Sequence, residues 1–181
     1  MSKQIPPKKP SVPPETYTQE YYESCCEGFL EFQESLGKTL PRRLQIPLNL
    51  ANLQPGEVVV DLGCGRGEMA LHCVLNGSCV WGLDYAPEAL KLAQRAIEKS
   101  AQGEMKERIG LQRGSATELP FAANSVDLVF MLDVVEHLYP HELDAAFAEV
   151  WRILRPGGRL VIHTMPNLWY YRFGYPLFRF V

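Results

Sequence analysis

The sequence has no long hydrophobic run. Its 181 residues contain no stretch of about 18 uncharged apolar residues, so no transmembrane helix is predicted. The first residues, 1–14, are rich in proline and lysine and lack the apolar segment of a secretory signal peptide. We interpret residues 1–14 as a disordered tail, and we expect no stable insertion into a membrane.

The sequence also has no strong excess of charge of one sign. It has 18 lysines and arginines against 21 aspartates and glutamates, a formal net charge of −3. A nucleic-acid-binding domain typically has a clear excess of basic residues. We therefore expect no nucleic-acid partner.

Paired cysteines are missing as well. None of the five cysteines forms a C-x-x-C pair with another; they are Cys25, Cys26, Cys64, Cys73 and Cys79. This spacing argues against a zinc site and against a disulfide framework. We predict no metal site and a reducing, cytoplasmic location.

One stretch near the middle of the chain has a clear pattern. Val58–Val60 is a β-branched run typical of a strand buried on both faces, and it ends at Asp61. Glycines then occupy alternate positions, at Gly63, Gly65 and Gly67, and a helical pattern follows. Glycine lets the backbone turn sharply and lets a ligand approach the main chain. Strand, glycine turn and helix form the nucleotide-binding unit of doubly wound α/β folds.

Strands and helices alternate through the rest of this region. Further strands are predicted at residues 79–83, 109–112, 126–132 and 159–164, and helices at residues 87–100 and 143–154. Such alternation indicates a parallel sheet with helical crossovers. We predict an α/β, Rossmann-like, doubly wound and mostly parallel sheet flanked by helices.

The helix at residues 143–154 shows a regular apolar stripe. The stripe is made of Leu143, Ala146, Phe147, Val150, Trp151 and Leu154. We expect this stripe to face the sheet. Residues 155–158, Arg-Pro-Gly-Gly, are predicted to form the turn into the last strand.

Aromatic segments lie on both sides of this domain, which we place at residues 54–164. Residues 15–53 are predicted to form an N-terminal helical cap or lid that includes Tyr17, Tyr21 and Tyr22. Residues 165–181 form an aromatic C-terminal segment. These aromatic side chains either contact a planar or lipid-like substrate or pack in a core or interface. The sequence favours packing but leaves both open.

The turn and a later aspartate point to a cofactor. The spacing of the glycines is G-x-G-x-G, which differs from the G-x-G-x-x-G of dinucleotide enzymes and disfavours a nicotinamide-dependent oxidoreductase. Asp84 ends the second strand about 20 residues later, where a carboxylate can accept hydrogen bonds from ribose hydroxyls.

The region 57–164 resembles the class I S-adenosylmethionine-dependent methyltransferases. The resemblance rests on Val-Asp-Leu-Gly-Cys-Gly-Arg-Gly at residues 60–67, Leu-Pro-Phe at 119–121, Leu-Asp-Val-Val-Glu-His at 132–137 and Arg-Pro-Gly-Gly at 155–158. It implies S-adenosylmethionine as the cofactor and transfer of a methyl group to an oxygen, nitrogen or carbon of a small-molecule acceptor.

The resemblance also implies roles for individual residues. Gly63, Cys64 and Gly65 would let the backbone approach the amino-acid end of the cofactor, and Asp61 would orient that end. Asp84 would hold the ribose hydroxyls. The further cofactor contacts that the resemblance implies are Gly67, Tyr85, Ser115, Ala116 and Leu132.

Two of these contacts concern the adenine. Tyr85 would lie against its ring. Ser115 stands where many relatives have an aspartate that accepts a hydrogen bond from the adenine amino group. A neutral hydroxyl accepts this bond more weakly than a carboxylate does.

His137 is the candidate general base. An imidazole just past the fourth strand has a pKa suited to proton transfer at neutral pH, but it could equally pack or cap the following loop. Asp133 could line the pocket or be solvated, and Glu136 is interpreted as structural. The other histidines, at positions 72, 141 and 163, are given no metal role.

The resemblance ends before the usual sheet is complete. Relatives continue past the fifth strand with a helix and two antiparallel strands that complete seven strands, whereas 17 residues follow Thr164 here. We therefore expect a sheet that lacks the last strands, with an open edge that a second copy or a partner could cover. The alternative function is a cofactor-binding but catalytically incomplete fragment or a regulatory subunit.

Overall fold

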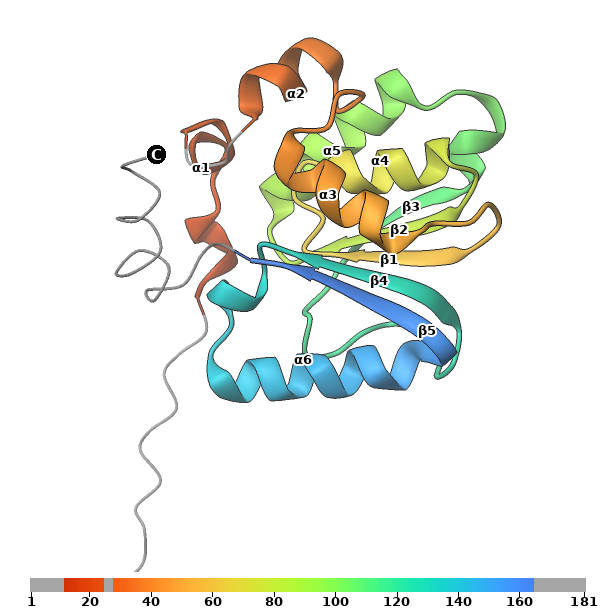
Figure 1. Ribbon diagram of the computed structural model, residues 1–181. Helices are drawn as coiled ribbons and strands as arrows, with labels where there is room; N and C mark the ends of the chain where they lie inside the picture. The colour runs from red at the N-terminus through yellow and green to blue at the C-terminus, as the bar shows by residue number, and fades with distance from the viewer. Residues whose placement is uncertain (1–11, 25–27, 165–181) are drawn as a thin grey trace, which may run out of the picture.

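The computed structural model describes residues 12–24 and 28–164. Their centre is a five-stranded sheet in the order β3-β2-β1-β4-β5, with all neighbouring strands parallel (Figure 1). The strands are β1 (Val58–Leu62), β2 (Cys79–Asp84), β3 (Ile109–Arg113), β4 (Val126–Leu132) and β5 (Leu154–His163). The predicted Rossmann-like α/β fold is thereby confirmed, with five strands in the described part of the chain.

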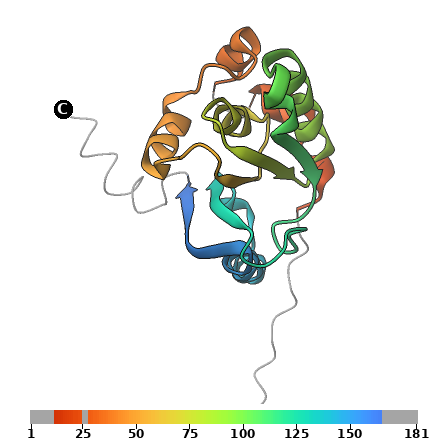
Figure 2. The same cartoon turned by 90° about the vertical axis from the view of Figure 1, so that its right-hand side faces the viewer.

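Helices cover both faces of this sheet. The α-helices among the described residues are α1 (Gln19–Ser24), α2 (Phe29–Ser35), α3 (Arg42–Ala51), α4 (Glu68–Leu75), α5 (Pro87–Ser100) and α6 (Pro140–Ile153). The short 3-10 helices are η1 (Pro14–Thr16), η2 (Gly103–Glu107) and η3 (Val135–His137). Helices α3, α4 and α5 lie on one face and α6 on the other (Figures 1 and 2). No helix among the described residues is both long and apolar enough to cross a membrane.

The core has two apolar layers, because side chains alternate along each strand. Val59 and Leu128 are fully buried in the layer that includes α4, whereas Val60 and Val129 are fully buried in the layer under α6. The middle strands are therefore apolar on both faces. This explains why the valine run of β1 predicts a central strand.

The predicted apolar stripe of α6 is wrong in part. Ala146, Val150 and Ile153 are buried, whereas Phe147 is 37% exposed and Trp151 is 84% exposed. The helix ends at Ile153, and the chain enters β5 directly at Leu154. Ile153, which the predicted stripe does not include, is buried, whereas Phe147 and Trp151 are not.

The turn predicted at residues 155–158 is a bulge inside β5. Leu154 already pairs with Val126, and regular pairing resumes between Arg159 and Leu128. Gly157 has a left-handed φ of 82°, which glycine adopts without steric cost. The fifth strand therefore begins earlier than predicted and contains the Arg-Pro-Gly-Gly motif.

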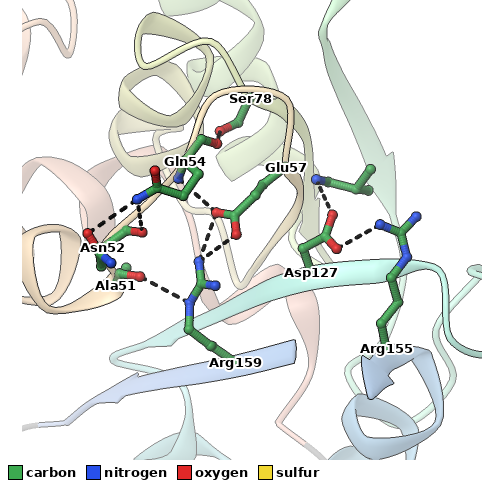
Figure 3. A network of polar contacts seen from close by, with 9 residues as sticks. Ala51, Asn52, Gln54, Glu57, Ser78, Asp127, Arg155 and Arg159 are labelled. Carbon is green, nitrogen blue, oxygen red and sulfur yellow. Dashed lines mark hydrogen bonds and ion pairs between the residues drawn. The ribbon is translucent and has the colours of Figure 1, made fainter. Parts of the chain in front are cut away.

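Paired charges fix the edge of the sheet where the strands begin, which we call the amino edge (Figure 3). Nη2 of Arg159 on β5 lies 2.8 Å from both carboxylate oxygens of Glu57, just before β1. Asp127 on β4 accepts the Val58 N–H at 2.8 Å and pairs with Arg155 at 2.7 Å. These contacts join β1, β4 and β5 at the edge opposite the candidate site.

Candidate functional site

A cavity of about 380 Å³ opens at the edge where β1, β2 and β4 end, which we call the carboxyl edge. Residues 63–67 form the glycine loop, and residues 63–66 of this loop form part of the cavity wall. Side chains of the segment that we call the N-terminal cap, the described residues 15–24 and 28–53, form another part. The predicted site residues that line it are Asp61, Gly63, Cys64, Gly65, Asp84, Tyr85, Ser115, Ala116, Leu132 and His137. The topology thus brings together residues that are far apart in the sequence.

Asp84 holds the glycine loop against the end of β2. One carboxylate oxygen of Asp84 accepts the Gly65 N–H at 2.9 Å, and the other accepts the Ala86 N–H at 2.9 Å. The Gly63 N–H donates to the Leu83 carbonyl at 2.7 Å. These hydrogen bonds fix the shape of the loop.

Two glycines of the loop, Gly63 and Gly65, differ in the space that surrounds them on the cavity side. Gly63 has a φ of 74°, and a Cβ there would lie 2.4 Å from a methyl group of Val134. Gly65 has a φ of 50°, and the nearest atom to a Cβ there is a Tyr22 ring carbon at 4.0 Å. Gly65 therefore faces open space in which a ligand can approach the main chain.

Gly67 is the predicted cofactor residue that does not line the cavity. It precedes α4 with a φ of 82°, and a Cβ there would lie 2.9 Å from the Ala93 Cβ on α5. The physical role of Gly67 is thus close packing of α4 against α5. A cofactor contact is not supported by its position.

Asp61 is a buried carboxylate with an unused oxygen. Its side chain is 2% exposed, and among the described residues its Oδ2 has no hydrogen-bond partner. Burial raises the pKa of Asp61 to about 7, with the charges of Asp84 and Glu68 adding to the effect and a backbone hydrogen bond from Ala70 opposing it. A cationic ligand group would satisfy this oxygen and stabilise its charge.

Tyr85 and Ser115 also line the cavity. The Tyr85 ring contacts Tyr17 edge-on at 5.4 Å between centroids. Burial, followed by the hydrogen bond with Tyr17, raises the pKa of Tyr85 further above the neutral range. The Ser115 hydroxyl lies 2.8 Å from the Thr117 hydroxyl and accepts the Thr117 N–H at 3.2 Å.

The cap tyrosines both pack and line the cavity. Tyr17 and Tyr22 are buried, and Tyr17, Tyr21 and Tyr22 all reach the cavity wall. Tyr17 also contacts the His137 ring edge-on at 5.8 Å, which places the candidate base beside this aromatic wall. The two sequence interpretations of these tyrosines are thus compatible.

One predicted segment lies wholly outside the described residues, and another lies partly outside them. The aromatic segment 165–181 lies wholly outside, and so do residues 1–11 of the predicted tail. The last residues of that tail are described, and Val12 and Pro14 line the cavity.

A charged cluster around Asp133 lies at the same edge. Asp133 lines the cavity, one of the two positions that the sequence left open for it. It forms an ion pair with Arg43 of α3, and its carboxylate lies 2.6 Å from His163 Nδ1; the sequence does not predict these two partners. Asp133 therefore links the cap to the ends of β4 and β5, and it has a left-handed φ of 56°. Its neighbour Glu136 accepts a hydrogen bond from the Thr164 hydroxyl at 3.1 Å.

No part of the described chain groups three histidine, cysteine, aspartate or glutamate side chains as a metal site would require. His72 instead contacts the Lys38 carbonyl at 3.0 Å. His141 stacks on Tyr139 at 6.2 Å between ring centroids.

Comparison with known proteins agrees with this geometry. Residues 60–162 match the sequence model of the methyltransferase domain family. The chain belongs to the class I S-adenosylmethionine-dependent methyltransferases. The chain is 32% identical to an uncharacterized methyltransferase of Synechocystis sp. over 127 residues, 69% of this chain and 56% of the relative. It is 38% identical to a demethylmenaquinone methyltransferase of Lactiplantibacillus plantarum over 107 residues, 57% of this chain and 43% of the relative.

A solved structure shows the same fold. Phosphoethanolamine N-methyltransferase 1 of Haemonchus contortus, solved with phosphoethanolamine and S-adenosylhomocysteine, matches with a TM-score of 0.63 at 21% identity. The match covers 82% of this chain and 31% of that one. The chain spans about half the length of the two curated relatives, 56% and 43%. The family predicted from the sequence is confirmed by the match over residues 60–162.

Proposed function

We propose that this methyltransferase binds S-adenosylmethionine in the carboxyl-edge cavity and transfers its methyl group to a small-molecule acceptor. The observation that carries the proposal is the buried Asp61 oxygen without a partner among the described residues, at the end of β1 beside a glycine loop. The amino-acid end of the cofactor carries an ammonium group, which matches a buried carboxylate in charge and in hydrogen bonding.

The other residues of the cavity fit the rest of this cofactor. The open side of Gly65 accommodates close approach to the main chain. Asp84 uses its carboxylate to hold two backbone N–H groups, and the remaining lone pairs can accept ribose hydroxyls. Tyr85 supplies a ring for the adenine, and Ser115, Ala116 and Leu132 complete this part of the wall.

The acceptor would lie between the cofactor and the cap. Tyr17, Tyr21 and Tyr22 offer aromatic surface with polar tips, which suits a small planar or amphipathic molecule. The relative from L. plantarum is named for demethylmenaquinone, a small molecule, which supports this class of acceptor.

The residues of this chain have mainly a positioning task. The cofactor supplies a methyl group that is already electrophilic, so alignment of the acceptor and exclusion of water account for most of the catalysis. His137 lines the cavity on the acceptor side, next to Tyr17. When the attacking atom carries a proton, His137 would accept it.

A turnover assay tests this function. The chain is incubated with S-adenosylmethionine and a panel of phenols, alcohols and amines, and methylated products are identified by mass spectrometry. We expect methylation of at least one small acceptor, and His137→Ala should slow it roughly 100-fold without weaker cofactor binding. His141→Ala is the matched control, because His141 does not line the cavity in the described part of the chain. Cofactor binding without turnover on any acceptor would support the non-catalytic alternative.

A further inference from the structure

Arg66 lies in the glycine loop, yet its side chain is buried. It is 3% exposed, and its guanidinium forms a two-pronged contact with Glu68, with Nη2 at 2.8 Å from Oε1 and Nε at 3.2 Å from Oε2. Glu68 is itself 5% exposed. Burying an ion pair costs desolvation energy, and a buried pair is therefore weak evidence for a contribution to stability. A role in fixing one arrangement of the surrounding elements is a better explanation of this pair.

The elements around this pair belong to the N-terminal cap. Arg66 Nη1 donates to the Tyr22 carbonyl of α1 at 3.4 Å. The guanidinium carbon lies 5.1 Å from the ring centroid of Phe32 and 5.9 Å from that of Phe29, both on α2. A planar guanidinium stacks well on aromatic rings, and such contacts strengthen when water is excluded. One side chain of the glycine loop thus contacts both of the first two cap helices.

The loop and the cap contribute to the same cavity in different ways. The loop presents Gly65 to the cofactor, and α1 presents Tyr21 and Tyr22 to the acceptor side. Helix α2, all of which is described, has no residue in the cavity wall. A ligand in the cavity can therefore influence α2 through contacts such as those of Arg66, but not by touching it.

We propose that Arg66 is a positioning residue that couples the cofactor loop to the cap, so that cofactor binding fixes the cap and assembles the aromatic wall for the acceptor. The inference rests on the proposed cofactor site. Coupling between two sites is reciprocal, so a bound acceptor would also tighten cofactor binding.

The variants must separate this coupling from simple loss of stability. Arg66→Ala alone would leave Glu68 buried without its arginine, so the test uses the double variant R66A/E68A. The matched control is R108A/E104A, which removes the same two residue types from an exposed pair between η2 and the residue after it. A third variant, R66K, keeps the charge near Glu68 but loses the planar stacking.

Hydrogen exchange of the full chain, with and without saturating S-adenosylhomocysteine, measures the coupling. In the wild type and in R108A/E104A we expect the ligand to slow exchange of the α2 amides about fivefold or more. In R66A/E68A, saturated as judged by calorimetry, this protection of α2 should be lost, while protection of the glycine loop remains. R66K should show intermediate protection. A purely structural role would lower the unfolding temperature but leave the ligand-induced protection of α2 in place.

The other outcomes overturn the proposal in distinguishable ways. If the wild type does not bind S-adenosylhomocysteine, the proposed function fails and the coupling fails with it. If the ligand binds but exchange in α2 does not change, or if the protection survives in R66A/E68A, Arg66 is not the coupling residue and the cofactor site stands. Arg66 and Glu68 both line the cavity. If R66A/E68A cannot be saturated at any ligand concentration, the pair is needed for cofactor binding itself and the coupling role is wrong.

Discussion

The two edges of the sheet differ in how their charges are satisfied. At the amino edge, Glu57 pairs with Arg159, and Asp127 uses both carboxylate oxygens, one for Arg155 and one for the Val58 amide. At the carboxyl edge, the Asp61 oxygen Oδ2 lacks a partner among the described residues and Asp61 has a pKa raised to about 7. The same strand, β1, thus begins in a satisfied network and ends in an unsatisfied carboxylate.

Left-handed backbone conformations occur at both edges and do not separate them. Gly63, Gly65 and Asp133 have left-handed φ angles near the cavity, and Asn52 and Asn124 have them near the starts of β1 and β4. The difference between the edges lies in their buried polar groups, which remain without partners where function requires it. The amino edge contributes stability through paired charges, whereas the carboxyl edge retains a carboxylate oxygen, without a partner among the described residues, that a ligand can satisfy.

The largest expected effect comes from Gly65→Val. A branched side chain would occupy the open space where the cofactor approaches the loop, so binding of S-adenosylhomocysteine should become undetectable by calorimetry. Gly157→Val at the amino edge is the control, because Gly157 also has a left-handed φ, of 82°, with nothing within 4 Å of its Cβ position. Equal affinity in the two variants would refute the close approach of the ligand at Gly65.

The next effect is that of Asp84→Ala. Loss of hydrogen bonds to a charged group should weaken S-adenosylhomocysteine binding by about 1–3 kcal/mol, roughly 5- to 150-fold. Asp127→Ala removes the same side chain at the amino edge, where it also holds a backbone amide. This control should lower stability to urea but leave the affinity unchanged. Similar losses of affinity in both variants would show that Asp84 acts only through the fold.

A smaller effect is the pH dependence of binding. With a pKa of about 7, Asp61 is mostly protonated at pH 5.5, whereas a ligand ammonium requires the carboxylate. Affinity for S-adenosylhomocysteine should therefore rise roughly 25-fold between pH 5.5 and 7.5, and binding near pH 6 should release a proton into the buffer. Asp84, whose pKa burial also raises, acts in the same direction. Asp61→Asn isolates the part due to Asp61.

Asp61 makes stability depend on pH in the opposite direction to ligand affinity: stability falls as the pH rises. The pKa of Asp61 is higher in the folded chain than its ordinary value of 3.8, so the folded state holds the proton more tightly. Its contribution to stability is therefore present below the ordinary pKa and is lost as the pH rises toward about 7. Urea unfolding of Asp61→Asn should show a weaker decline over this pH range. An unchanged pH profile would contradict the raised pKa.

The smallest effect on binding is expected for Arg159→Met. It breaks the pair with Glu57, and because the pair is partly exposed the loss of unfolding free energy should be about 1 kcal/mol. Affinity for S-adenosylhomocysteine should not change. Urea denaturation and calorimetry on the same sample check both statements, and a loss of affinity would show that the two edges are not independent.

The sequence predicts the central strands and the residues that meet at the carboxyl edge because their signals are local. The valine run of β1, the alternate glycines and the aspartate ending β2 each lie within a few residues, and parallel strands bring their carboxyl ends together. The orientation of α6 could not be predicted from its stripe alone. The face that packs on the sheet includes Ala146, Val150 and Ile153, and Trp151 lies outside it. The stripe is wide enough that the sequence does not tell which part of it is buried.

Contacts between distant segments could not be predicted from the sequence. Arg43 lies 90 residues from Asp133, and His163 lies 30 residues beyond it, so only the crossovers bring the three together. Gly67 has the same local signal as Gly63 and Gly65, but its neighbour Ala93 comes from another helix. A pattern of glycines therefore predicts a tight loop without telling which glycine faces the ligand.

The most direct test is a calorimetric titration of the purified chain with S-adenosylhomocysteine, with NAD as the control ligand. We predict saturable binding of one S-adenosylhomocysteine per chain, with an affinity that rises toward neutral pH, and no binding of NAD. A folded sample that binds neither ligand, or that binds NAD instead, would contradict the assignment of the carboxyl edge as the S-adenosylmethionine site.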